Sequence, residues 1–479
     1  MCGILGLYGQ DDVSRELVAG LTALQHRGQD AAGVVTFDTT FRMKKGLGLV
    51  SQVFRHESSF DGLAAPSGLG HVRYATIGST DVLDAQPIAV NYPFGLAMVH
   101  NGNVINFRQL RKTLYEEHHR LLDTSNDVAL ILYTFASQLE TKDLKNLTVD
   151  DIFDTVCATQ QRVQGAYSAI GIIANHGFLA FTDPHGIRPI VMGRKFTDQG
   201  ISYAFASETS CFDYLGYETV KNLGPGEAVF IDESKQVHSR VCMKAEKPAF
   251  CVFEYIYFGR EDSIFHDRVV ATERVRIGRQ LGRKFAKSGL QPDIVIDVPS
   301  SAYFFASGLA EELNIPYRRG LAKNNHVGRS FIMPNQAQRE YLVRQKLNPI
   351  QDVVRDKKVA VVDDSIVRGT TSKRLVQLLR QAGAAEVYVV SAAPPIKYPC
   401  VYGIDMSIKR EIIAAHYTRD QIAQYIEADA VVYQDQEDLK NLYHDLPCCY
   451  ACFSGDYPTG ITQEALECIE EEKRCSNRM

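Results

Sequence analysis

The sequence lacks the features that would place the protein in a membrane or on a nucleic acid. No apolar run approaches the ~20 residues of a membrane span, and the opening residues MCGILGLYGQ lack the basic region and long apolar core of a signal peptide. Positive charge is not in excess, because 52 Lys and Arg stand against 57 Asp and Glu. We therefore expect a cytoplasmic protein, or one of an organelle matrix if a transit peptide has been removed, with no nucleic-acid or membrane partner.

Internal repeats and low-complexity tracts are also absent, as are two common nucleotide-binding patterns, GxGxxG and GxxxxGK[ST]. What is present is the composition of an ordinary globular protein, with 45% hydrophobic and 23% charged residues. At ~150 residues per domain, the 479 residues allow about three domains, or two large ones.

Cysteine is more abundant than packing requires, and its number, eleven, is odd. In a reducing compartment such cysteines are better candidates for catalysis or metal binding than for disulfides. Their distribution is uneven. One is Cys2, and five crowd near the other end at Cys448, Cys449, Cys452, Cys468 and Cys475.

The first half alternates short β-rich runs with amphipathic helical stretches. In residues 128–139, for example, Ala129, Leu132 and Phe135 recur at helical spacing. Closely spaced strands with helices between them predict an α+β domain of stacked sheets with helices outside. The polar segment 233–248 then marks a boundary near residue 240, so we expect domains at 2–240 and 241–479.

The second half has a different pattern. Apolar strands at 293–299 and 357–364 each precede a helix-like stretch, and a third apolar run begins at Glu386. Strand, helix and strand at this spacing predict an α/β domain with a parallel, doubly wound sheet.

Cys2 directly follows the initiator Met. A small second residue permits removal of Met1, which would leave Cys2 with a free α-amine. That amine titrates near ~7.7–8.0 and the thiol near ~8.5, so the amine could take the thiol proton directly or through one water. While Met1 is retained, the amine is blocked. The alternative is a small apolar residue that opens an edge strand.

Several further motifs follow MCGILG along the chain. LQHRGQDAAG begins at Leu24, GHVRYATIG at Gly70 and VHNGN at Val99, and TSNDV, FTDPHGIRP and FASE follow. This ordered set resembles the glutaminase domain of class II glutamine amidotransferases, which are N-terminal-nucleophile hydrolases with an αββα sandwich fold.

The resemblance implies a role for each matching residue. Cys2 would be the nucleophile, with Arg27 beside it, and Asn101 and the Gly102 N–H would bind the oxyanion, as amide hydrolysis by a thiolate requires. Arg73 would pair with the glutamine α-carboxylate, where a bidentate guanidinium is well suited. Asp127 would hold the glutamine ammonium.

The segment AVVDDSIVRGTTSKR, residues 360–374, combines a buried strand, two carboxylates, a turn and a helix start. Unpaired N–H groups at a helix N-terminus favour a phosphate. The carboxylates Asp363 and Asp364 could take two ribose hydroxyls or Mg²⁺. Ordinary N-capping is the alternative, but it needs neither two acids nor two Thr around a Gly.

This segment resembles the diphosphoribose-binding loop of type I phosphoribosyltransferases. The resemblance assigns phosphoribosyl pyrophosphate to Asp363, Asp364, Ser365, Arg368, Gly369, Thr370 and Thr371. It also makes the basic stretch 323–350 a loop that folds over the pyrophosphate, with Arg329 and Lys346 among its cations. Ser301 matches a metal-linked position, although PSSA is one residue shorter than the family pattern.

Both halves occur together in the amidophosphoribosyltransferase family, which the chain resembles nearly from end to end. The resemblance implies formation of 5-phosphoribosylamine from phosphoribosyl pyrophosphate, glutamine and water, with ammonia passing between two sites, a homotetramer and inhibition by purine nucleotides. Gly259 and Glu261 stand where the family usually has Ala and Pro. Glutamine-dependent sugar aminotransferases lack the VVDDSIVRGTTS loop, and a non-catalytic sensor would not need Cys2, Arg73 or Asn101.

The C-terminal cysteines have a spacing that suits metal binding. Cys449 and Cys452 form a CxxC pair, which can chelate one metal centre but needs two further ligands. With Cys251 and Cys400 they match positions at which some family members bind a [4Fe–4S] cluster. Zinc or free buried thiols are the alternatives.

Overall fold

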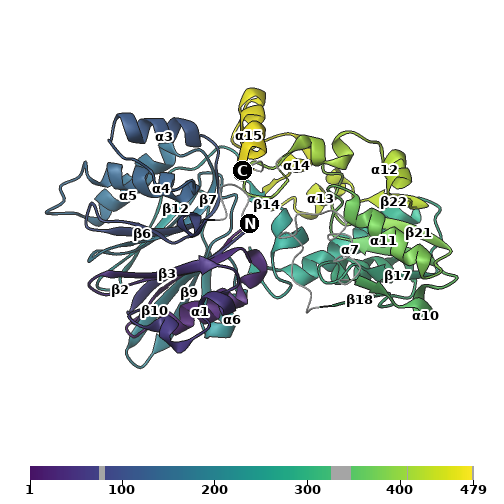
Figure 1. Ribbon diagram of the computed structural model, residues 1–479, viewed down its shortest axis with the longest axis horizontal. Helices are drawn as coiled ribbons and strands as arrows, with labels where there is room; N and C mark the ends of the chain where they lie inside the picture. The colour runs from purple at the N-terminus through teal and green to yellow at the C-terminus, as the bar shows by residue number, and fades with distance from the viewer. Residues whose placement is uncertain (75–80, 325–346, 407, 477–479) are drawn as a thin grey trace.

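The protein is described by a computed structural model that covers residues 1–74, 81–324, 347–406 and 408–476 (Figure 1). The chain forms two parts that lie side by side, one built on two antiparallel sheets and one on a parallel sheet. Among the helices of these ranges, none is both long and apolar enough to cross a membrane.

Seven strands form the first antiparallel sheet, in the order β11-β9-β10-β1-β4-β2-β3. Its strands are β1 (Gly3–Tyr8), β2 (Ala31–Phe37), β3 (Phe41–Leu47), β4 (Ser67–Arg73), β9 (Val191–Thr197), β10 (Gly200–Ala206) and β11 (Glu218–Asn222). Strand β1 lies between β10 and β4, with Gly3 opposite Val72. The start of β1, and with it Cys2, is therefore held inside a sheet instead of at its edge.

Six strands form the second antiparallel sheet, in the order β13-β12-β8-β7-β6-β5. They are β5 (Ile88–Val90), β6 (Leu96–Val104), β7 (Gly165–Ile173), β8 (Gly177–Thr182), β12 (Glu227–Asp232) and β13 (Val237–Val241). Strand β13 falls inside the polar segment 233–248, which was expected to contain the domain boundary. Its side chains alternate between exposed and half-buried, as an edge strand with one solvated face allows.

The two sheets pack face to face, and helices cover their outer faces. Ile4, Leu69 and Ile170 belong to the core between the sheets. Outside the first sheet lie α1 (Ser14–Ala23) and α6 (Ser210–Leu215), and outside the second lie α3 (Phe107–Glu116), α4 (Asp127–Leu139) and α5 (Val149–Arg162). The expected helix at 128–139 and the αββα sandwich are confirmed.

The second part contains a four-stranded parallel sheet in the order β17-β20-β21-β22. Its strands are β17 (Ile294–Asp297), β20 (Lys358–Asp363), β21 (Glu386–Ser391) and β22 (Ala430–Tyr433), and its helices are α7 (Val270–Ala286), α8 (Tyr303–Leu313), α11 (Thr370–Gln381), α12 (Arg419–Ile426) and α13 (Gln436–Leu442). The predicted parallel sheet is confirmed. Because neighbouring strands run in the same direction, the ends of β17 and β20 bring Ser301 beside Asp364.

Short elements join the two parts. β14 (Phe250–Cys251) pairs in parallel with β23 (Cys448–Cys449), and the π-helical turn η4 (Glu254–Phe258) follows. The remaining short elements are α2 (Val50–Val53), β15 (Ile264–Phe265), β16 (Arg268–Val269), β18 (Leu321–Lys323), β19 (Leu347–Pro349), α10 (Gln351–Val354), α14 (Ala451–Ser454), α15 (Gln463–Ser476), and the 3-10 turns η1 (Gln25–Arg27), η2 (Glu57–Phe60), η3 (Val82–Asp84), η6 (Lys409–Glu411) and η7 (Ile413–Ala415).

Candidate active sites

Cys2 lies half-buried at the start of β1. Ser207 holds this end of the strand, because its hydroxyl accepts a hydrogen bond from the Ile4 N–H (3.1 Å) and its own N–H donates to the Ile4 carbonyl (3.0 Å). The Cys2 sulfur lies 3.8 Å from the Tyr74 carbonyl oxygen. Met1 is buried beside it, and burial lowers the pKa of the Met1 amine to about 5. With Met1 in place, the Cys2 nitrogen is an amide donor and not a base.

Asn101 touches Cys2 directly from the second sheet. Its Oδ1 accepts a hydrogen bond from the Cys2 N–H (3.1 Å), whereas its buried Nδ2 has no hydrogen-bond partner. The next residue, Gly102, has φ +151°, and a Cβ there would lie 1.9 Å from the Ala166 carbonyl oxygen. Only glycine allows the backbone to adopt this conformation. The Asn101 Nδ2 group remains beside Cys2 as a buried donor without a hydrogen-bond partner.

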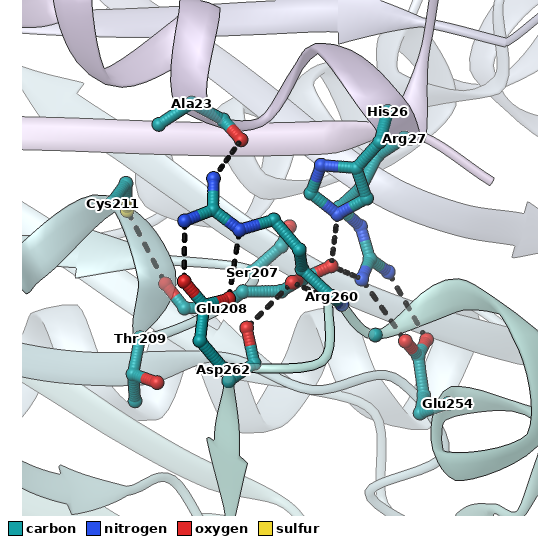
Figure 2. A network of polar contacts seen from close by, with 12 residues as sticks. Ala23, His26, Arg27, Ser207, Glu208, Thr209, Cys211, Glu254, Arg260 and Asp262 are labelled. Carbon is teal, nitrogen blue, oxygen red and sulfur yellow. Dashed lines mark hydrogen bonds and ion pairs between the residues drawn. The ribbon is translucent and has the colours of Figure 1, made fainter. Parts of the chain in front are cut away.

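Arg27 is fully buried, and Figure 2 shows it bonded to the carboxylates of Glu208 and Glu254. Its Nε donates to the Cys2 carbonyl oxygen (3.0 Å). Its two terminal nitrogens donate to both Glu254 oxygens (3.0 and 3.1 Å), and one also donates to Glu208. Burial raises the pKa of Glu208, but His26 and Arg27 outweigh this effect and hold it below its ordinary value. Glu208 therefore stays ionised in the interior.

Of the two predicted glutamine-binding residues, Arg73 lies on the strand next to β1, and Asp127 contacts β6, the strand that carries Asn101. Arg73 is the buried last residue of β4, and continuing the β1–β4 register by one residue places it opposite Cys2. Asp127 begins α4, and its oxygens lie 3.2 Å from His100 Nε2 and 3.0 Å from the Val104 nitrogen. Burial raises the pKa of Asp127, yet His100 and these hydrogen bonds outweigh it and bring the pKa below its usual range. Arg73 is thus placed beside Cys2, and Asp127 stays ionised beside β6.

The second group of candidate residues lies at the carboxyl end of β20. Asp364 Oδ2 accepts a hydrogen bond from the Ser301 hydroxyl (2.5 Å), and Oδ1 accepts one from the Ser365 hydroxyl (2.8 Å). Burial, together with repulsion from Asp364, raises the pKa of Asp363 well above its ordinary value. Burial also raises the pKa of Asp364, although Ser301, Ser365 and Arg274 oppose the change. Among the described residues, the positive charge that acts on this pair, that of Arg274, is outweighed by burial.

The turn after Asp364 leads into α11. Gly369 has φ +75° and precedes the helix, whose first two residues, Thr370 and Thr371, are exposed. Their N–H groups and hydroxyls thus remain accessible at the helix N-terminus. Arg368 is exposed, and its Nε lies 2.9 Å from a Glu411 oxygen. The predicted contacts of Arg329 and Lys346 lie outside the described residues.

Four of the predicted metal ligands are buried at the junction. Cys251 of β14 stands in register with Cys449 of β23. The Cys452 carbonyl accepts hydrogen bonds from two residues of the segment that carries Cys400 (2.9 and 3.0 Å). Burial raises the pKa of Cys251 to about 11, with a further contribution from Cys400, and it raises those of Cys449 and Cys452 well above their ordinary value. Within the described ranges, no three Cys, His, Asp or Glu side chains form a group that could hold a metal ion.

The segment after Cys400 contacts the part built on the two antiparallel sheets. The Val401 carbonyl accepts a hydrogen bond from Asn103 Nδ2 (2.8 Å), and the Tyr402 carbonyl accepts one from Arg188 Nε (2.8 Å). A Cβ on Gly403 would lie 2.9 Å from the Gly102 carbonyl oxygen. The backbones of the two parts therefore approach each other beside Asn101.

The sequence reasoning missed the two carboxylates that hold Arg27. Glu208 directly follows the Ser207 of a recognised motif, and Glu254 is a single charge inside the apolar run AFCVFEYIYF. A charged residue in such a run signals a buried ion pair, since an unpaired buried charge is costly. The sequence does not identify its partner, because 227 residues separate Glu254 from Arg27.

The chain is similar to known proteins, both in a single domain and over most of its length. A family model described as a glutamine amidotransferase domain matches residues 71–214. The amidophosphoribosyltransferase of Pasteurella multocida is 43% identical over 488 residues, which cover 99% of this chain and 96% of that protein. The amidophosphoribosyltransferase of Escherichia coli is 44% identical over 446 residues, with 92% and 88% covered.

Two solved structures are similar over nearly the whole chain. The glutamine phosphoribosylpyrophosphate amidotransferase of B. subtilis, in complex with ADP and GMP, superimposes with a TM-score of 0.85 at 36% identity, covering 97% of this chain and 98% of that one. A structure described as the allosteric regulatory enzyme of purine biosynthesis gives a TM-score of 0.86 at 37% identity, with 97% of each chain covered.

Proposed function

The chain belongs to the amidophosphoribosyltransferase family, and from this premise we propose how its residues carry out the reaction. 5-Phosphoribosyl 1-pyrophosphate, glutamine and water give 5-phosphoribosylamine, glutamate and pyrophosphate, the first committed step of purine synthesis. The observation that carries the proposal is the Cys2–Asn101 contact, in which a thiol stands beside a buried amide with an unused donor.

The first half-reaction releases ammonia from glutamine. Once Met1 is removed, the Cys2 amine takes the thiol proton, and the thiolate attacks the carboxamide carbon. Asn101 Nδ2 and the Gly102 N–H stabilise the oxyanion of the tetrahedral intermediate. The Cys2 ammonium returns the thiol proton to the nitrogen that leaves as ammonia, and water then hydrolyses the thioester to glutamate and the free thiol. Arg73 and Asp127 hold the α-carboxylate and the ammonium of the substrate.

The second half-reaction joins ammonia to the sugar. Ammonia displaces pyrophosphate at C1 of the ribose, while the turn Ser365–Thr371 binds the 5-phosphate through N–H groups and hydroxyls. The raised pKa values of Asp363 and Asp364, with the hydroxyl of Ser301 beside them, fit an oxygen-ligated cation. These three residues would hold Mg²⁺, which when bound would neutralise charge on the pyrophosphate. Arg329, Lys346 and Arg368 would supply further positive charge.

We further propose that Cys251, Cys400, Cys449 and Cys452 hold a [4Fe–4S] cluster. The four thiols are buried on segments that hydrogen-bond to one another, and soft sulfur ligands suit iron–sulfur clusters or zinc. In the part of the chain that the structure describes, the thiols do not close into a metal-binding group, so the proposal requires them to move together when the cluster binds. The group would be structural, because the reaction transfers no electrons. Protein purified without oxygen is expected to be brown, with about four irons per chain. Colourless protein that contains one zinc would contradict the cluster.

Regulation, assembly and location are proposed on the resemblance. Purine nucleotides are proposed as feedback inhibitors, in agreement with the ADP and GMP bound to the B. subtilis relative. A homotetramer and a cytoplasmic location are expected from the family. The domain boundary near residue 240 is supported by the end of β13 at Val241.

One experiment tests the mechanism as a whole. Glutamate release from glutamine is measured with and without phosphoribosyl pyrophosphate, for the native protein and for Cys2→Ala. Stimulation by phosphoribosyl pyrophosphate is expected, and Cys2→Ala should abolish glutamate release while sparing synthesis from added ammonia. Hydrolysis that survives Cys2→Ala, or that ignores phosphoribosyl pyrophosphate, would sink the mechanism.

A further inference from the structure

We propose that Glu208 is a positioning residue through which binding at the phosphoribosyl site affects Cys2. One of its carboxylate oxygens contacts the residues that hold Cys2, and the other contacts a turn on the side of the phosphoribosyl site. The inference rests on the proposed function, in which the two half-reactions are coupled. Glu208 lies fully buried just after β10, between the glutaminase sheets and the residues that follow η4.

One oxygen of Glu208 faces the nucleophile. Oε1 accepts a hydrogen bond from Arg27 and lies 2.9 Å from His26 Nε2. Arg27 in turn donates to the Cys2 carbonyl oxygen (3.0 Å). A shift of this oxygen therefore moves the guanidinium that holds the backbone of Cys2.

The other oxygen faces the turn Gly259–Ser263. Oε2 accepts a hydrogen bond from the Arg260 N–H (3.0 Å) and another from the Ser263 hydroxyl (2.7 Å). Thr209, the next residue after Glu208, accepts a hydrogen bond from the Ile264 N–H through its hydroxyl (2.8 Å). Figure 2 shows this carboxylate between Arg27 and the chain at Arg260.

The same turn is tied to the phosphoribosyl site through α7. The Val270 N–H donates to the Ser263 carbonyl (3.0 Å), and the Ala271 N–H donates to the Glu261 carbonyl (2.9 Å). Arg274, one turn further along α7, donates to the carbonyls of Tyr255 (2.9 Å) and Gly259 (2.7 Å).

Arg274 also contacts the helix that leads from Ser301, a neighbour of the carboxylates of β20. Its guanidinium carbon lies 5.8 Å from the centre of the Phe305 ring of α8, and α7 approaches α8 closely, since a Cβ on Gly278 would lie 2.2 Å from the Phe305 carbonyl oxygen. Helix α8 begins two residues after Ser301, whose hydroxyl donates to Asp364 (2.5 Å). Arg274, the turn Gly259–Ser263, Glu208 and Arg27 continue this set of contacts as far as Cys2.

A neutral variant of the same shape tests the proposal. Glu208→Gln keeps the side-chain volume but cannot accept hydrogen bonds on both sides, because its amide nitrogen is a donor. We expect the ratio of glutaminase rates with and without phosphoribosyl pyrophosphate to fall at least about fivefold, the lower end of typical coupling between sites. Ammonia-dependent synthesis should stay within about twofold of the native rate, since the contacts at Asp364 remain.

Glu227→Gln is the matched control. Glu227 also accepts hydrogen bonds from a cation, a Ser hydroxyl and a backbone N–H, namely those of Lys221, Ser239 (2.7 Å) and Gly224 (2.8 Å), but it lies away from the turn. Glu227→Gln should keep the native stimulation ratio. If Glu227→Gln lowers the ratio as much as Glu208→Gln, or if Glu208→Gln keeps it, the proposal is wrong.

Ser263→Ala keeps the test decisive if Glu208→Gln does not fold. This change removes only the hydroxyl contact on the turn side, so it should lower the stimulation ratio without altering the unstimulated glutaminase rate. An unchanged ratio would contradict the proposal. Failure of the proposed function is distinguishable, because it would show in the native protein as glutamate release that phosphoribosyl pyrophosphate does not stimulate.

Discussion

The proposed glutamine site and the proposed phosphoribosyl site differ in how many contacts within the protein hold their residues in place. At the first, Asn101 and Arg27 each hydrogen-bond to the backbone of Cys2, which lies between strands of two packed sheets. At the second, Asp363 and Asp364 repel each other, and two Thr side chains face solvent. The first site is therefore largely formed before its substrate arrives, whereas the second needs a cation to balance its two carboxylates.

The largest expected effect comes from removing the charge at the second site. Asp363→Asn and Asp364→Asn should each lower ammonia-dependent synthesis by at least about 10²-fold, because each removes a ligand for Mg²⁺ or the ribose. Pyrophosphate release with ammonia as substrate measures the effect. Asp293→Asn, at the opposite end of the same sheet, where it accepts from the Lys358 N–H (2.8 Å), is the control. Near-native synthesis by both site variants would mean that the carboxylates have no part in the site.

The next largest effect is expected from Asn101, whose Nδ2 is the unused donor at the proposed glutamine site. Asn101→Ala should lower kcat for glutamine hydrolysis by about 10²–10³-fold with little change in KM, because this donor acts on the oxyanion and not on bound glutamine. Steady-state glutamate release measures both constants. Asn103→Ala removes a neighbouring amide that instead binds the Val401 carbonyl, and it should cost far less. A rise in KM alone would reassign Asn101 to substrate binding.

A smaller effect is expected from the predicted carboxylate clamp. Arg73→Lys keeps the charge but loses the bidentate geometry, so KM for glutamine should rise by about tenfold while kcat changes little. Glutamine titrations of the glutaminase rate provide the measurement. Arg194→Lys, on the same sheet but exposed, should leave both constants unchanged. An unaltered KM in Arg73→Lys would place the glutamine carboxylate elsewhere.

The smallest effect concerns acid stability of the glutaminase part. Burial, with His100 and Arg73 nearby, lowers the pKa of His71 well below its ordinary value, and neither ring nitrogen has a hydrogen-bond partner. The unfolded chain therefore binds a proton that the folded one does not, so stability falls as pH drops below about 6.5, by up to about 1.4 kcal/mol per pH unit. Urea unfolding between pH 7 and pH 5 should show a shallower loss for His71→Leu than for the native protein or the exposed control His56→Asn.

Much of the fold follows from local patterns. Alternating strands, the apolar runs that became β17, β20 and β21, and the helix at 128–139 were predictable because each depends on residues close in sequence. Strand β13 was not, since an exposed edge strand carries little hydrophobic signal.

The candidate site residues were predictable where a motif carries them, as at Cys2, Asn101 and Asp364. The partners of Arg27 were not predictable, because Glu208 and Glu254 reach it across 181 and 227 residues of chain. Local sequence specifies a buried charge more readily than the contact that neutralises it.

The pairing of β14 with β23 cannot form until nearly the whole chain has been synthesised. β14 must wait for a partner that leaves the ribosome nearly 200 residues later, which at 5–20 residues per second is about 10–40 s. During that interval the edge of β14 is open to pairing with other chains. Truncation after the parallel sheet would remove β23 and leave that edge open permanently. Loss of a short C-terminal segment should therefore cause the nascent chain to aggregate, although its antiparallel sheets and its parallel sheet are already complete.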